Sequence, residues 1–212
     1  MISGLSVVLL GFVLGMRHAT DADHVVAVST IVSRQPAIGR ASAIGALWGV
    51  GHTATILLFG GAILLFRLTI PPRLGLALEF AVALMLVLLG IRNLTGRGFT
   101  RLESAMRPLF VGFVHGLAGT AFVAMLVLAA IPAPALGMIY LALFGLGTIV
   151  GMMLITFAIA MPTVLAARRF VRLQTYVRVA AGVASIVLGL VLAHQVGVVD
   201  GLFAASPTWT PK

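Results

Sequence analysis

The sequence of 212 residues contains no cysteine and few charged side chains. Without cysteine there is no disulfide, no thiolate metal ligand and no thiol nucleophile. Charged residues make up 9% of the chain, whereas a soluble domain carries roughly 25%. No hydrophilic stretch is long enough to form a separate soluble domain. These deficits exclude an ordinary soluble protein, and we expect one membrane domain over residues 1–212.

What the chain has instead is long apolar stretches, with 61% hydrophobic residues and a mean hydropathy of +1.18. A helix needs about 20 apolar residues to cross the hydrocarbon core of a bilayer. The pattern predicts an all-α integral membrane protein with six transmembrane helices, the first an intact span and not a cleaved signal. Proline and arginine mark the breaks between them. The predicted spans cover residues 3–32, 39–66, 74–94, 108–131, 135–161 and 176–196.

The basic residues predict the orientation. Ten arginines fall between spans 1 and 2, 3 and 4, and 5 and 6, while Arg67, Arg73 and Lys212 fall on the opposite side. Cytoplasmic loops carry the excess of positive charge, so both termini are expected outside a bacterial or archaeal cytoplasmic membrane. The net charge of +9 therefore reports topology and contact with anionic lipid. The bilayer is an expected partner, and nucleic acid is not.

The two halves of the chain resemble each other. Residues 11–15 resemble 112–116, residues 47–52 resemble 143–148, and residues 87–90 resemble 186–189, at offsets of 101, 96 and 99. With three spans in each half, the second half enters the membrane inverted, as in many transporters with a site near the midplane. We predict two inverted three-helix repeats, 1–96 and 107–200. G-x-x-x-G pairs in spans 1, 2, 4 and 5 place these at the centre and spans 3 and 6 outside.

A polar stretch, residues 15–24, interrupts the first apolar span. A charged side chain at bilayer depth costs at least about 2.5–3.5 kcal/mol, so this stretch needs a compensating partner. Imidazole and carboxylate together suit Ni, Co, Zn and Fe. On a straight helix His18, Asp21 and His24 share one arc while Asp23 points away. We therefore expect unwinding around residues 19–23, which brings His18, Asp23 and His24 together at a divalent metal ion.

His52 lies in the middle of span 2 beside Gly51. A lone histidine in a membrane span is commonly a hydrogen bonder between helices, but beside the first stretch it is expected to be a further ligand. The predicted metal ligands are therefore His18, Asp21, Asp23, His24 and His52.

Five further residues are candidates for the ion pathway, each with a structural alternative. Arg17 is either a partner of the aspartates or a moving gate. His115 is either a relay on the exit path or a hydrogen-bonding residue. Thr148 occupies the place of the span 2 histidine in the second half, and it and Thr120 either bind the water shell of the ion or serve helix packing. Glu79 either attracts cations or pairs with a nearby arginine.

Two of these motifs carry a family resemblance. Residues 17–24, Arg-His-Ala-Thr-Asp-Ala-Asp-His, resemble the R-H-A-x-D-A-D-H motif of the nickel/cobalt transporter (NiCoT) family, and residues 51–53 resemble its G-H-S/T motif. Longer members carry acidic motifs in later spans, where residues 115–120 and 147–152 here lack a carboxylate. The chain is also two spans shorter, and is more similar to the short six-helix branch associated with urease accessory genes.

The resemblance implies Ni²⁺ or Co²⁺ as a transported substrate, with no permanently bound cofactor. It leaves open a homo-oligomer and a link to the maturation of urease or another nickel enzyme.

The energy source is expected to be the membrane potential. The chain has no G-x-x-x-x-G-K-[ST] phosphate loop. A dication moving inward gains about 4.6 kcal/mol per 100 mV, which supports about a thousand-fold accumulation. Uptake by a protein that is not an enzyme is the predicted function. The alternatives are metal efflux, a non-transporting partner in metalloenzyme maturation, and an intramembrane metal-dependent hydrolase, for which H-E-x-x-H and a free general base are lacking.

Overall fold

A computed structural model describes residues 4–33, 35, 37–96, 106–118, 133–167 and 172–209, and every regular element in these ranges is helical. The helices of the first half are α1 (Gly4–His18), α2 (Ala22–Val32), α3 (Ile38–Thr55), the π-helical turn η1 (Ile56–Gly60), α4 (Gly61–Phe66) and α5 (Pro72–Thr95). Residues 106–118 form a further helix. The helices α7 (Pro134–Ala167) and α8 (Leu173–His194) and the π-helical turn η2 (Gln195–Val199) follow.

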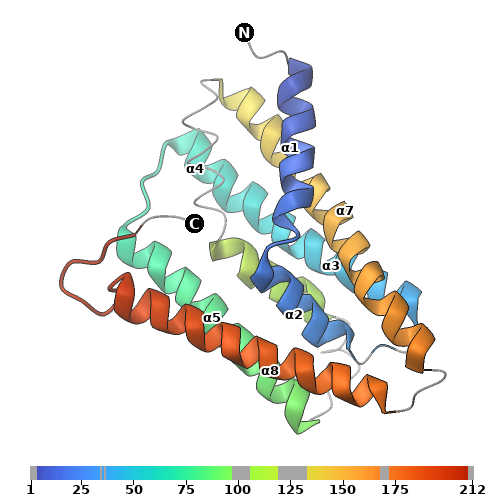
Figure 1. The fold of residues 1–212 in the computed structure, drawn as a ribbon. Helices are drawn as coiled ribbons and strands as arrows, with labels where there is room; N and C mark the ends of the chain where they lie inside the picture. The colour runs from blue at the N-terminus through green and yellow to red at the C-terminus, as the bar shows by residue number, and fades with distance from the viewer. Residues whose placement is uncertain are drawn as a thin grey trace.

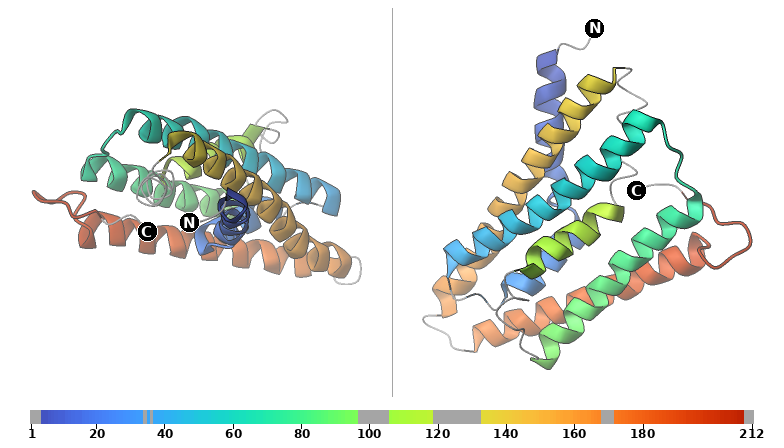
Figure 2. Two further views of the ribbon diagram at one scale, coloured as in Figure 1. Left: turned by 90° about the horizontal axis from the view of Figure 1, so that it is seen from above. Right: turned by 180° about the vertical axis from the view of Figure 1, so that it is seen from behind.

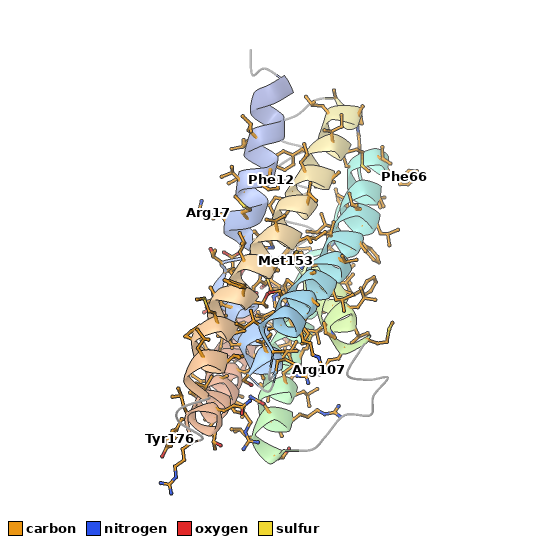
Figure 3. The ribbon with its side chains drawn as sticks, turned by 90° about the vertical axis from the view of Figure 1, so that its right-hand side faces the viewer. Phe12, Arg17, Phe66, Arg107, Met153 and Tyr176 are labelled. Carbon is orange, nitrogen blue, oxygen red and sulfur yellow. The ribbon has the colours of Figure 1, made fainter. Side chains whose placement is uncertain are left out.

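Within the described residues, four continuous helical stretches are long and apolar enough to cross a membrane: Ile38–Phe66, Pro72–Thr95, Pro134–Leu165 and Leu173–Val199. Each begins within four residues of a predicted span. Large apolar side chains cover the outward surface, among them Phe66, which projects from α4 in Figure 3. The chain is therefore a multi-pass membrane protein. Of the predicted span 108–131, the described residues end at 118, so Thr120 lies outside them.

The first predicted span is broken in the middle. Helix α1 ends at His18 and α2 begins at Ala22, with Asp21 in an extended conformation between them. The hydroxyl of Thr20 donates to the Arg17 carbonyl at 2.6 Å. Short polar side chains offer the backbone such local alternatives to the helix. The predicted unwinding of this stretch is confirmed, with the break at residues 19–21.

The helices form two groups with a narrow layer between them (Figure 1). Helices α1 and α3 both pack along α7, and α5 and α8 pair along the opposite edge. Helix α2 contacts α5, α7 and α8. Seen from behind, the helix 106–118 runs between α3 and α5 (Figure 2). His24, at the start of α2, thus lies inside the bundle, between the two groups, whereas Arg17 and Asp21 are exposed.

Glycine allows α1 and α7 to touch backbone to backbone. A Cβ atom on Gly15 would overlap the carbonyl of Phe144, and one on Gly147 would overlap the carbonyl of Phe12. Small residues at such crossings let helices approach closely, as the G-x-x-x-G pattern predicts.

The helix 106–118 crosses α3 in the same way. A Cβ atom on Gly51 would overlap the carbonyl of Leu109, and one on Gly112 would overlap the carbonyl of Trp48. These contacts fix the height of the helix 106–118 against α3.

Helices α5 and α8 also meet through glycine, although neither carries a G-x-x-x-G pair. A Cβ atom on Gly90 would lie 2.6 Å from the carbonyl oxygen of Gly182, and one on Gly189 would lie 2.7 Å from that of Ala83. The hydroxyl of Ser185 also donates to the Leu86 carbonyl at 2.7 Å. Small residues therefore build this peripheral pair as well as the central helices.

Candidate metal site

Four imidazoles gather where the first span is broken. His24, His52 and His115 are each at most 2% exposed. The ring of His24 lies 4.5 Å from those of His18 and His115 and 5.1 Å from that of His52, measured between ring centroids. His24 is thus the centre of a histidine cluster formed by α1, α2, α3 and the helix 106–118.

The helix break fixes the orientation of the His24 ring. Its Nδ1 lies 2.9 Å from the carbonyl oxygen of His18. Because a carbonyl oxygen only accepts, Nδ1 carries the proton, and Nε2 keeps a lone pair. In an unbroken helix the carbonyl of His18 would accept from the N–H of Ala22. The break therefore supplies the acceptor that leaves Nε2 of His24 available as a ligand.

Asp21 orients His18 in a similar way. Its Oδ2 lies 2.8 Å from Nδ1 of His18, and a carboxylate only accepts, so Nε2 of His18 keeps the lone pair. That Nε2 lies 3.2 Å from Nε2 of His52. Two nitrogens bound to one ion at about 2.0–2.1 Å lie about 2.8–3.4 Å apart at bond angles near 90–110°. The separation of the two Nε2 atoms fits a shared cation.

Asp23 lies on the other side of His24, against the helix 106–118. Its Oδ2 accepts from Nε2 of His115 at 2.7 Å, and its Oδ1 accepts from the backbone N–H of His24 at 3.0 Å. Nδ1 of His115 is buried and has no hydrogen-bond partner. Asp23 is therefore held by two donors, and His115 keeps one free nitrogen.

Two groups of three side chains bring one ligand atom each within 4.8 Å of one another: His18, His24 and His52, and Asp23, His24 and His115. Four of the five predicted ligands belong to these groups. Asp21 does not, because its carboxylate is 53% exposed and contacts the ring of His18 instead. His115, predicted as a relay or a hydrogen bonder, joins the second group.

Arg17 lies away from this cluster. Its side chain is exposed and projects away from the neighbouring helices (Figure 3). Among the described ion pairs, Asp21 and Asp23 contact His18 and His115, and neither contacts Arg17. The described contacts of the two aspartates are therefore with imidazoles, and the role of Arg17 stays a prediction.

A cavity of about 400 Å³ reaches the cluster. Its lining runs from His18, Asp23, His24 and His115 to Glu79 on α5 and Gln195 at the start of η2. Glu79 accepts a hydrogen bond from Nε1 of Trp209 at 2.8 Å. His52 is not part of the lining and is fully buried, so it lies behind the other imidazoles.

Thr148 donates its hydroxyl to the carbonyls of Phe144, at 2.9 Å, and Gly15, at 3.3 Å. These bonds join α7 to α1, in keeping with the helix-packing alternative. Arg73 donates to the carbonyls of Ala204 and Ala205, so Arg73 and Glu79 each contact the C-terminal segment.

One residue of the cluster was not anticipated from the sequence. The indole of Trp48 is fully buried and stacks on His52, with centroids 5.2 Å apart and an interplanar angle of 9°. Its ring also lies 4.8 Å from that of His24 and 5.3 Å from that of His115. The signal was available, because residues four apart on a helix share a face. Trp48 forms an apolar wall that excludes water from this side of the imidazoles.

The fold and the cluster together define a class: a multi-pass membrane protein with histidines and carboxylates gathered inside the helix bundle. The urease accessory protein UreH of Bacillus sp. (strain TB-90) is 36% identical over 218 residues, covering 94% of this chain and 95% of that protein. A high-affinity nickel transport protein of Cupriavidus necator is 34% identical over 71 residues, covering 33% of this chain and 20% of that protein. No protein-family model matches the chain, and no solved structure matches it significantly.

The chain belongs to the family of the urease accessory protein UreH. The partial match to a nickel transport protein agrees with the family resemblance that the two motifs carry. One relative is an accessory protein and the other a transport protein, so the comparisons confirm the prediction that the protein is not an enzyme.

Proposed function

We propose that this protein carries divalent Ni²⁺ or Co²⁺ into the cytoplasm through the histidine cluster. The observation that carries the proposal is the convergence of three buried imidazoles and Asp23 on the broken first span. Buried polar groups in a membrane are expensive and mark ion pathways. Imidazole and carboxylate without thiolate suit Ni²⁺ and Co²⁺, and the name of the nickel transport relative supports the same substrate class.

The metal ligands in this proposal are His18, Asp23, His24 and His52. Asp21 acts through His18, because a carboxylate on the second ring nitrogen fixes the ring and raises its basicity. His115 extends the cluster beyond these residues. Glu79 lies on the same cavity and attracts the cation from the mouth that the predicted topology places outside.

The architecture in this proposal is six spans in two inverted repeats, 1–96 and 107–200. Helices α1 and α2 are the two parts of span 1, and the helix 106–118 begins span 4. The contacts of α1 with α7 and of the helix 106–118 with α3 support it, because they involve corresponding residues. Gly15 against Phe144 becomes Gly112 against Trp48 when 97 is added to the residue number on α1 and 96 is subtracted from the one on α7. Between α5 and α8 an offset of 99 residues turns the contact of Gly90 with Gly182 into that of Gly189 with Ala83.

Contacts on α3 and α7 support the same relation. A Cβ atom on Gly49 would meet Ile149, and one on Gly145 would meet Thr53. The second contact is the first with the two helices exchanged, at an offset of 96 residues. The shift of 97 for span 1 differs by about one helical turn from the 101 taken from the residue pattern. The offset of 97 makes His115 the counterpart of His18.

Ring contacts agree with this counterpart. His18 lies 5.3 Å from Phe144 and His115 lies 5.3 Å from Trp48, between centroids. Phe144 and Trp48 are themselves related by 96. The two histidines thus hold the same position against the same face of the partner helix.

The orientation in this proposal follows the arginine distribution, with the arginine-rich loops between spans 1 and 2, 3 and 4, and 5 and 6 in the cytoplasm and both termini outside. The membrane potential then drives uptake, at about 4.6 kcal/mol for each dication per 100 mV.

The test is Ni²⁺ uptake into proteoliposomes that contain the purified full-length chain. We expect uptake under an imposed inside-negative potential to exceed uptake at zero potential by at least about tenfold, since 60 mV already favours a dication by about 2.8 kcal/mol. Reversing the potential should slow uptake. Uptake that ignores the potential, or equals that of empty vesicles, contradicts the proposal.

A further inference from the structure

The two groups of ligands suggest how an ion moves, a point that rests on the proposed function and goes beyond it. We infer that the ion occupies two overlapping seats in turn. The outer seat consists of Asp23, His24 and His115, and the inner seat of His18, His24 and His52. His24 belongs to both and keeps hold of the ion while the other ligands exchange.

The geometry separates the two seats. Within the described residues, no single group brings all five of these side chains together, only the two groups of three. The rings of His52 and His115 lie 6.3 Å apart, whereas His24 lies 5.1 and 4.5 Å from them. The His24 ring is held between the two groups, because its Nδ1 is hydrogen bonded to the carbonyl of His18.

The cavity gives the order of the seats. All three residues of the outer seat line the cavity. Of the inner seat, His18 and the shared His24 also line it, and His52 does not. An ion that comes along the cavity past Glu79 therefore finds the outer seat complete on the cavity wall, whereas the inner seat is completed only by His52 behind it. It reaches His52 only by moving past His24, against the indole of Trp48.

The charges of the two seats differ in the same order. The outer seat has a carboxylate, which compensates a dication as it loses water, whereas the inner seat has three neutral imidazoles. Conduction requires binding that is favourable enough to enter and weak enough, or shared over enough sites, to leave. A charged outer seat followed by a neutral inner seat meets both requirements.

The ligands of the outer seat are available without breaking the contact between its two helices. His115 donates from Nε2 to Asp23, and its buried Nδ1 has no hydrogen-bond partner. The second oxygen of Asp23 receives only the backbone N–H of His24 among the described hydrogen bonds. His115 is also the counterpart of His18 in the proposed repeats, so the transfer passes the ion from one repeat to the other.

The experiment compares Ni²⁺ binding with Ni²⁺ uptake in the purified full-length chain. The variants are His52→Ala, which removes a ligand of the inner seat, His115→Ala, which removes one of the outer seat, and His24→Ala, which removes the shared ligand. His194→Ala, on α8 and outside the cluster, is the matched control. His52→Gln and His115→Gln accompany the alanine variants, and helix content and elution volume in detergent establish folding.

We expect the single-seat variants to bind Ni²⁺ within about tenfold of the parent, through the seat that remains, and to lose uptake by at least about thirtyfold, since tenfold is the lower range for a disturbed metal shell. His24→Ala should lose both. Nickel X-ray absorption should show a larger carboxylate share of ligands in His52→Ala and a larger imidazole share in His115→Ala.

Parental uptake by His115→Ala, or binding lost as completely in His52→Ala and His115→Ala as in His24→Ala, would overturn the two-seat inference. In either case the proposed function stands, because the parent still takes up Ni²⁺. A parent that neither binds nor takes up Ni²⁺ overturns the proposed function instead, and with it the two seats.

Discussion

The two halves of the molecule share their helix crossings and differ in their polar side chains. Gly15 on α1 meets α7 as Gly112 meets α3. At corresponding places α3 presents His52 to the cluster, while α7 presents Thr148, whose hydroxyl donates to backbone carbonyls. The comparison teaches that close packing and ligand chemistry are separate properties here. The packing recurs in both halves, and most of the ligands come from one.

The largest effect on folding should come from placing a side chain at the glycines where α1 crosses α7 and where the helix 106–118 crosses α3. Gly15→Leu and Gly112→Leu each place a side chain where the backbone of the partner helix lies, so both should abolish recovery of folded protein. Overpacking alone costs about 1–3 kcal/mol, and backbone cannot move as a side chain can. Gly39→Leu is the control, because nothing lies within 4 Å of a Cβ atom there.

Monodisperse recovery in detergent and the thermal midpoint measure this effect. If Gly15→Leu collapses while Gly112→Leu is recovered like Gly39→Leu, the two crossings are not equivalent and the proposed repeats lose their main support.

A second change makes the first half resemble the second. His52→Thr gives α3 the residue that α7 carries at position 148, and should reduce Ni²⁺ uptake by at least about thirtyfold, while the fold survives because threonine fits a buried helix face. The reason is the loss of the Nε2 atom that lies 3.2 Å from that of His18. Uptake at the parental rate would show that the difference between the halves has no chemical role.

A smaller effect is expected at Asp21. Asp21→Asn keeps an oxygen acceptor for Nδ1 of His18 but removes the charge, so Ni²⁺ affinity should fall about tenfold, the lower range for changes to the partner of a ligand. Asp23→Asn, in contact with both His24 and His115, should cost more. Calorimetric titration with Ni²⁺ measures both, and equal losses would place Asp21 among the ligands.

The smallest effect is expected at Thr148. Thr148→Val is nearly isosteric and removes a hydroxyl that bonds the carbonyls of Phe144 and Gly15. Such bonds between membrane helices are worth about 0.6 kcal/mol on average, so the thermal midpoint should fall slightly and uptake should stay within about twofold. A large loss of uptake with unchanged stability would assign Thr148 to the ion's water shell instead.

The sequence was sufficient for features that follow from local chemistry. Apolar length placed the long helices, and the positions of His18, Asp23 and His24 on a straight helix predicted unwinding around residues 19–23, where the structure has the break. The sequence was insufficient where the partner lies on another helix. The bond of Asp23 to His115 spans 92 residues, and the outward direction of Arg17 depends on how α1 meets α7. Repetitive glycine and leucine also allowed an offset of 101 for span 1, whereas the contacts between helices support the offset of 97 in the proposed repeats.

The stacking of Trp48 on His52 has a practical consequence. The chain has two tryptophans, and they stand at the two ends of the proposed route, Trp48 against the cluster and Trp209 against Glu79. Paramagnetic ions such as Ni²⁺ quench nearby indole fluorescence. With Trp209→Phe, emission from Trp48 alone would report the arrival of the cation in real time, without any attached dye.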